Sequence, residues 1–192
     1  MPASLRRRVS AIGRKALEAA WEILPEQGSP RLVLSSRHGE YRRTFGLLTS
    51  LAEDGTVSPA EFGLSVHHAL AGLLSIATAN HSGHTAISAG ANSFGYGLLE
   101  AASCLDEDRA PVLLIHFDEP LPEIYPPLND GGDPPLALAL LLAPSEGGEA
   151  MEMTQDPDAS PPVGAVAHQF LDFLQSSESE RRAAGWRWRR AA

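Results

Sequence analysis

The amino-acid sequence predicts a layered α/β fold, and three observations support this prediction. Short apolar runs with strand character alternate along the chain with longer segments of helical periodicity. Two of the runs, 111–117 and 136–143, are almost continuously apolar, as strands are when both faces of their sheet are covered. The chain has 192 residues, of which 43% are hydrophobic, so it is long enough to bury a core in one compact domain.

The first part of the chain is predicted to contain a helix, a strand and a second helix in that order. Apolar side chains recur at steps of three and four over residues 5–24, which indicates an amphipathic helix. Residues 31–36 have strand character, and residues 44–52 are predicted to form a short helix that ends before the turn at Asp54 and Gly55.

The clearest local signal is a capping box formed by Ser58, Pro59 and Glu61. A Ser oxygen at the N-cap accepts a backbone N–H, Pro suits the first helical position, and a Glu three residues after the cap reaches back to the cap N–H. This signal predicts a helix that continues to about residue 77, with Phe62 and Val66 on its buried face.

The middle of the chain is predicted to form a strand over 84–89, a tight turn over 90–93 and a helix over 94–105. Gly95 and Gly97 lie in the first turns of that helix, where glycine weakens a solvated helix. Their presence therefore predicts that another backbone or a ligand approaches the helix closely.

The C-terminal part is predicted to be less regular. Residues 144–164 are rich in Pro, Gly, Asp and Glu and are interpreted as a flexible linker. Residues 165–175 are predicted to form one more short helix, and the basic tail 185–192 is expected to be frayed.

Charge is segregated along the chain, whose formal net charge is −9. Ten of the fifteen Lys and Arg lie in the first 15 residues or after residue 180, whereas all 24 Asp and Glu lie between these ends. An acidic body argues against nucleic-acid binding, which needs a basic face. The basic ends are either solvated termini or a surface that attracts an acidic carrier protein.

Composition also limits the cellular setting. No apolar run reaches the roughly 18 residues of a membrane span, and no apolar segment follows the N-terminal arginines as it does in a secretory signal. The single cysteine, Cys104, leaves no partner for an internal disulfide and suits a reducing environment. We therefore expect a cytoplasmic protein in which Cys104 is a buried structural thiol.

Residues 75–101, SIATANHSGHTAISAGANSFGYGLLEA, resemble the nucleophile region of β-ketoacyl synthases of the thiolase fold. In that family a strand ends in a small-residue turn, and a Cys in this turn lies at the N-terminus of the next helix. Ala91 falls at the Cys position when the strand and helix are aligned without a gap, and a second alignment places Asn80 there. Neither side chain attacks a thioester, so the resemblance implies a subunit without condensation activity.

The chain is more closely similar to chain-length factors, the silent ketosynthase-like subunits found with aryl-polyene synthases. The similar stretches are SSRHGEYRRTFGLL, SPAEFGLSVHHALAGLLSIA, HTAISAGANSFGYGLLEAA and PVLLIHFDEPLPEIY. The resemblance implies a heterodimer with an active ketosynthase whose acyl tunnel the silent subunit helps to shape. We expect no cofactor and no metal. The half of the family that carries its catalytic histidines, and the strand that opens its first half, are both expected to be missing.

The resemblance also divides the chain. Residues 1–143 are expected to form the N-terminal half of the thiolase fold, 144–164 the linker, and 165–192 a C-terminal helix with a basic tail.

The site residues follow from the same resemblance. The strand that pairs across the dimer interface is expected to present three alternating residues: Thr85, Ile87 and Ala89. The silent turn beside the tunnel is expected to consist of Ala91 and its neighbours: Gly90, Asn92, Ser93 and Phe94. The capped helix is expected to approach the tunnel with three side chains: Phe62, Val66 and His67.

Two other functions remain open on the sequence. One is a scaffold that binds synthase or carrier protein without setting chain length, and the other is a residual acyl-thioester enzyme using His84 or Asp118. A serine hydrolase is disfavoured because neither Ser82 nor Ser93 lies in a G-x-S-x-G elbow. A zinc site is disfavoured because no H-E-x-x-H pattern contains any of four neighbouring histidines: His67, His68, His81 and His84.

Overall fold

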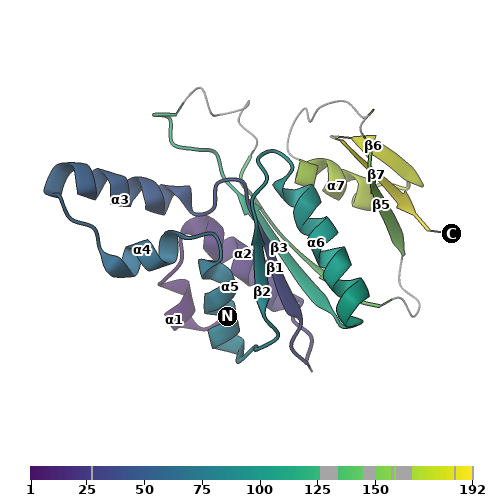
Figure 1. The fold of residues 1–192 in the computed structure, drawn as a ribbon, viewed down its shortest axis with the longest axis horizontal. Helices are drawn as coiled ribbons and strands as arrows, with labels where there is room; N and C mark the ends of the chain where they lie inside the picture. Colours follow the sequence, from purple (N-terminus) through teal and green to yellow (C-terminus); the bar gives the residue numbers. More distant parts are fainter. Residues whose placement is uncertain are drawn as a thin grey trace.

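The computed structural model describes residues 1–26, 28–125, 134–144, 150–156, 158, 166–183, 185–191. Its main sheet has the strand order β2-β1-β3-β4. Figure 1 labels the first three of these strands at the centre of the molecule. The strands β1 (Arg31–Ser35), β2 (His84–Ile87) and β3 (Val112–Asp118) are parallel, and β4 (Leu136–Leu142) is antiparallel to β3. Because β2 is the first strand in this order, its outer edge pairs with no strand in the described part of the chain.

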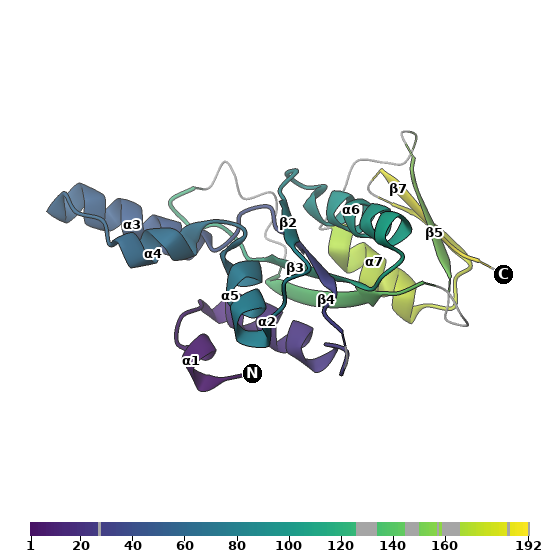
Figure 2. The same cartoon turned by 60° about the horizontal axis from the view of Figure 1, so that its bottom comes forward.

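Both faces of the main sheet are covered, which explains why its strands are so apolar. Leu32 and Leu34 of β1 point into a core shared with α2 (Ala11–Glu22) and α5 (Ala69–Thr78). Val33 points to the other face, into a core shared with α6 (Ser93–Asp108) and α7 (Val166–Gln175). Figure 2 shows α2 and α5 on one side of the sheet and α6 and α7 on the other. The helices on both faces of the sheet confirm the layered α/β architecture that the sequence predicts.

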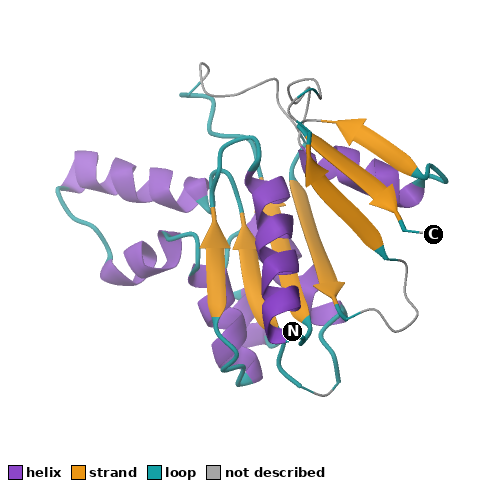
Figure 3. Cartoon of the chain, turned by 45° about the vertical axis from the view of Figure 1, so that its right-hand side comes forward, coloured by secondary structure: helices purple, strands orange, loops and turns teal. Residues whose placement is uncertain are grey.

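A small antiparallel sheet lies beyond α6 and α7 (Figure 3). It has the order β5-β7-β6, with β5 (Met151–Gln155), β6 (Glu180–Ala183) and β7 (Trp186–Arg190). Trp186 and Trp188 of β7 are buried in the α6–α7 core. The small sheet therefore covers the outer side of this helical layer.

The small sheet corrects two expectations, since β5 lies within the predicted linker and β7 within the tail that was expected to be frayed. The reason is the alternation of Trp and Arg in β7, which turns both indoles inward and the intervening guanidinium outward. The Arg190 guanidinium donates to the carbonyl oxygens of Phe173, Leu174 and Ser176 at the end of α7. Most of the rest of 144–164 lies outside the described residues.

The predicted helix over 5–24 is two helices. α1 (Ala3–Arg6) ends before Ser10, whose hydroxyl accepts the Gly13 N–H and so caps α2. The sequence pattern did not separate them because the apolar periodicity continues through the break.

The α3–α4 arm, residues 41–65, projects from the body of the molecule (Figure 1). It consists of α3 (Tyr41–Asp54) and α4 (Pro59–Ser65), and neither helix has a fully buried residue. The Ser58 hydroxyl accepts the Glu61 N–H, as the capping box predicts. The helix does not continue to residue 77, because α4 stops at Ser65 and α5 leaves at an angle of 97°.

This bend overturns the expectation that Phe62 is buried. The α4 helix turns away from the core, and Phe62 is 61% exposed as a result. Among the described residues no single helix is long and apolar enough to cross a membrane, and only the bent pair of α4 and α5 meets that test by length and composition.

Candidate functional site

The candidate site is the turn between β2 and α6. Gly90 adopts a backbone φ of +58°, a conformation that favours glycine. The Ser93 hydroxyl accepts the Ala89 N–H at 2.9 Å and donates to the Gly90 carbonyl at 2.7 Å, so this one side chain closes the turn. Asn92 N–H donates to the Ala89 carbonyl at 3.1 Å. These bonds hold Ala91 at the start of α6.

Ala91 is exposed at this turn, where a nucleophile would be well placed. The N-terminus of a helix carries a partial positive charge that favours a thiolate, which is why a cysteine there becomes reactive. A methyl group gains nothing from this field and offers no lone pair to a thioester.

Cys104 does not take the place of such a nucleophile. It lies three turns further along α6 and is only 5% exposed. Burial raises the pKa of the Cys104 thiol, although the nearby Arg31 acts in the opposite direction. A buried thiol with a raised pKa is a core residue and not a reactive one.

The turn residues behind Ala91 point into the protein. Phe94 is buried and packs edge-on against the His116 ring, with 5.2 Å between ring centroids. The Asn92 side-chain oxygen accepts the Trp186 indole N–H at 3.2 Å. Sequence reasoning missed Trp186 as a support of this turn because the tail was expected to be frayed.

At the two glycines of α6 the close approach is made by side chains, and not by the backbone or ligand that the sequence predicted. A Cβ at Gly95 would overlap the Trp186 ring. A Cβ at Gly97 would lie 2.5 Å from the Ser35 Cβ. The glycines thus let α6 pack directly between β7 and β1.

Thr85 and Ile87 are half-buried on β2, and Ala89 is exposed just after it. Leu32 N–H donates to the Gly83 carbonyl and Ser36 N–H to the Ile87 carbonyl. Alternation along the strand then turns the N–H and C=O of residue 86 toward the unpaired edge. Backbone groups are therefore available there for another strand.

The predicted tunnel residues are divided between two places. Phe62 lies on the arm, whereas Val66 and His67 are half-buried in the bend before α5. The His67 ring lies against Gly39, where a Cβ would be 3.3 Å from the ring. Neither the bend nor the arm is part of the turn that holds Ala91.

A buried polar chain beneath the turn was also missed on the sequence. His116 Nδ1 is 2.9 Å from Ser35 Oγ, and its Nε2 is 3.7 Å from the Asp118 carboxylate. Burial lowers the pKa of His116, with Asp118 acting in the opposite direction. A histidine inside an otherwise apolar strand was the available signal, but the partner Ser35 is distant in sequence.

This Ser–His–Asp order does not form a hydrolytic site. Ser35 is 1% exposed and His116 is 4% exposed, so no substrate reaches them. The Asp118 carboxylate already accepts the Ser36 hydroxyl and the backbone N–H groups of Arg37 and His38. Asp118 therefore holds the loop after β1 and is not free to act as the base of a residual enzyme.

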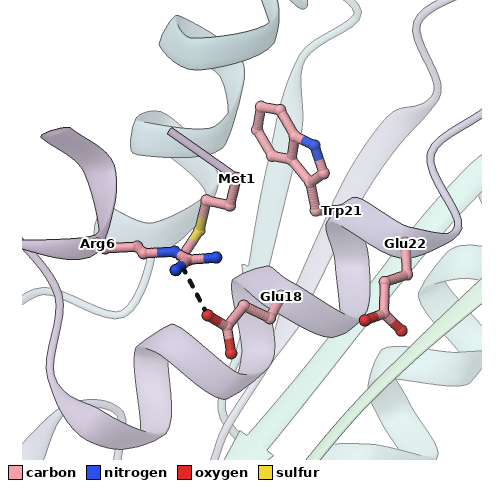
Figure 4. A pocket seen from close by; sticks show the side chains of 5 residues that line it. All are labelled: Met1, Arg6, Glu18, Trp21 and Glu22. Atoms are coloured by element: carbon pink, nitrogen blue, oxygen red, sulfur yellow. Dashed lines mark ion pairs between the residues drawn. The ribbon is translucent and has the colours of Figure 1, made fainter. Parts of the chain in front are cut away.

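Two further features lie away from the turn. A surface pocket between α1 and α2, shown in Figure 4, contains the ion pair of Arg6 and Glu18 at 3.6 Å, and no predicted site residue lines it. The rings of His68 and His84 stack at 5.9 Å. Within the described ranges, no three His, Cys, Asp or Glu side chains are grouped so as to hold a metal ion.

Comparison with known proteins agrees with this geometry. The family described as "Beta-ketoacyl synthase, N-terminal domain" matches residues 1–192. A solved structure, "Ketosynthase (ApeO) in Complex with its Chain Length Factor (ApeC) from Xenorhabdus doucetiae", matches with a TM-score of 0.83 and 27% identity. The match covers 100% of this chain and 82% of that chain. No curated protein sequence matches at a significant level.

The thiolase-like layers, the strand–turn–helix around Ala91 and the match over the whole sequence lead to one assignment. This chain belongs to the family of β-ketoacyl synthase N-terminal domains.

Proposed function

We propose that this protein is a silent ketosynthase-like subunit, a chain-length factor, that dimerises with an active β-ketoacyl synthase in a pathway of the aryl-polyene type. The observation that carries the proposal is Ala91, a methyl group at the helix N-terminus where a condensing enzyme keeps its cysteine. In the proposed dimer the partner supplies the nucleophile, and this chain helps to close the acyl tunnel.

The structural comparison supports the silent role. The similar structure is a ketosynthase bound to its chain length factor, and this chain spans 82% of the matched chain. Cofactor-free acyl transfer needs only the partner's cysteine and its base, so we propose no cofactor here.

The open edge of β2 supports the dimer. Thr85, Ile87 and Ala89 are the residues proposed to meet the partner, because they lie on or just after β2, whose outer edge pairs with no strand among the described residues. An acidic carrier protein is a further proposed partner, and the cytoplasm is the proposed location.

Substitution of Ala86 by proline tests the pairing directly. The change removes an outward N–H from β2 and leaves the bonds to β1 in place, so the fold should persist. We expect Ala86→Pro to abolish co-purification with the ketosynthase while the urea midpoint changes little. A pair that survives this substitution would show that β2 is not the pairing strand.

Two assays separate the competing functions. Sustained turnover of acyl-carrier thioesters by the isolated chain would establish a residual enzyme. In the reconstituted pair, Phe62→Ala is expected to lengthen the product, because the exposed Phe62 ring is proposed to reach the acyl tunnel of the partner. Unchanged product length with intact pairing would favour a scaffold that does not set the length of the acyl product.

A further inference from the structure

The small sheet contacts the start of α6, directly behind the silent turn, a name we keep for residues 90–94. The Trp186 indole N–H donates to the Asn92 side-chain oxygen at 3.2 Å. The Trp186 ring also packs edge-on against the Tyr96 ring, with 5.4 Å between the ring centroids. On the neighbouring strand, the Gln155 side-chain amide donates to the Tyr96 hydroxyl at 2.8 Å. Strands β5 and β7 therefore both hold the start of the helix.

The start of α6 is packed tightly between the two sheets. The Trp186 ring fills the place that a side chain at Gly95 would take, and Ser35 of β1 does the same at Gly97. Trp186 is 2% exposed and Ser35 is 1% exposed, so both contacts lie inside the protein. Because protein interiors are close-packed, the position of a helix held in this way depends on the size of the side chains on both sides.

The silent turn is attached to each sheet by a different side chain. Phe94 packs against His116 of β3 and so holds the turn to the main sheet. Asn92 accepts the Trp186 indole N–H and so holds the turn to the small sheet. The hydrogen bonds of the Ser93 hydroxyl lie within the turn, so they shape it without setting its place between the sheets. The place of the turn therefore depends on both attachments.

We propose that Trp186 is a positioning residue, which fixes the place of the silent turn from the small sheet and thereby limits the length of the product that the heterodimer makes. The inference rests on the proposed function, and it adds a residue that lies outside the proposed dimer interface. Trp186 acts through Asn92 and Gly95 and does not touch the acyl chain. If its hold is weakened, α6 can settle toward the small sheet and the turn can withdraw from the tunnel of the partner.

The test compares Trp186→Phe with a matched control, Trp188→Phe, in the full chain. Both indoles are buried on β7, and phenylalanine keeps an aromatic ring while it removes the indole N–H. The Trp188 N–H has no hydrogen-bond partner within the described ranges, and its ring packs against Phe170 and Phe173. The two variants therefore lose similar ring area, but only Trp186→Phe loses a hydrogen bond to the silent turn.

The first measurement is amide hydrogen exchange of the full chain alone, at the N–H groups of Ala89 and Asn92 that bond within the turn. Loss of one hydrogen bond to the turn should make these amides exchange about three- to tenfold faster in Trp186→Phe. In Trp188→Phe the rates should change by less than about twofold. This measurement needs neither the partner nor any product.

The second measurement is the distribution of product lengths made by the reconstituted pair. We expect Trp186→Phe to shift the distribution toward longer products and Trp188→Phe to leave it unchanged. The Kd of both variants for the ketosynthase should stay within about twofold of the original value, because β2 is not altered. A merely structural role of Trp186 would lower the amount of product without changing its length.

The outcomes separate this inference from the proposed function. If Trp186→Phe matches the control in both measurements while the pair still forms product, the inference is wrong and the proposed function stands. Faster exchange with unchanged product length would also overturn the inference, because the turn would then be positioned without limiting the product. If the original chain does not bind the ketosynthase at all, the proposed function fails and the inference fails with it.

Discussion

The small sheet and the α3–α4 arm are both peripheral to the main sheet, but their apolar side chains differ in exposure. Trp186 and Trp188 of the small sheet are 2% and 0% exposed, whereas Leu51 and Phe62 of the arm are 50% and 61% exposed. The tryptophans complete the core around α6, whereas the base of the arm is held by the ion pairs of Arg43 with Glu40 and Glu61. This difference indicates that the small sheet stabilises the fold, whereas the arm is available to a partner.

The largest expected effect comes from removing a tryptophan of the small sheet. Trp188 packs against the rings of Phe170 and Phe173, with centroid distances of 5.5 and 6.3 Å. Trp188→Ala should lower the free energy of unfolding by about 3–5 kcal/mol because it opens a cavity. Leu51→Ala in the arm should cost less than about 1 kcal/mol by the same urea titration. Equal losses at the two positions would erase the contrast between the regions.

A glycine-to-alanine substitution should have opposite signs in the two regions. At Gly95 the added methyl meets the Trp186 ring, so Gly95→Ala should destabilise the fold by about 1–3 kcal/mol. Gly63 of α4 has nothing within 4 Å of the same position, so Gly63→Ala should stabilise the chain by up to about 1 kcal/mol through helix propensity. Thermal unfolding of both variants measures the two signs. A stabilising Gly95→Ala would mean that β7 does not pack on α6.

The smallest expected effect is a dependence of the free energy of unfolding on pH. We expect it to originate in the core and not in the arm. Burial lowers the pKa of His116 in the folded chain, so the unfolded chain binds the proton more readily. Stability should therefore fall as pH drops below the unfolded value of about 6.5, by at most about 1.4 kcal/mol per pH unit.

Urea midpoints at pH 7.5 and 5.5 measure this dependence, and His116→Gln should reduce it. Residues 41–65 contain no histidine, so no histidine of the arm contributes to this dependence. A pH dependence that is identical in His116→Gln would place its origin elsewhere.

Local patterns in the sequence predicted the elements that depend on local physics. The apolar runs became β1, β3 and β4, and the Ser58 hydroxyl accepts the Glu61 N–H at the start of α4. Each of these features is determined by neighbours within a few residues, or by burial on both faces of a strand.

The remaining features depend on contacts between distant segments. Apolar periodicity showed that Phe62 lies on a helix but not which way the helix turns after the bend at Val66. The contact of Ser35 with His116 spans 81 residues, and it exists only because β1 and β3 are adjacent. The Trp–Arg alternation of β7 was visible in the sequence, but its terminal position and charge favoured a frayed tail.

The most direct test of the silent role is the mass of each subunit after the reconstituted pair is mixed with an acyl-carrier thioester and no extender. The acyl group should appear on the ketosynthase, and this chain should keep its unmodified mass, because Ala91 offers only a methyl group at the turn. A stable acyl adduct on this chain would contradict the silent role and would place a nucleophile where none is described above.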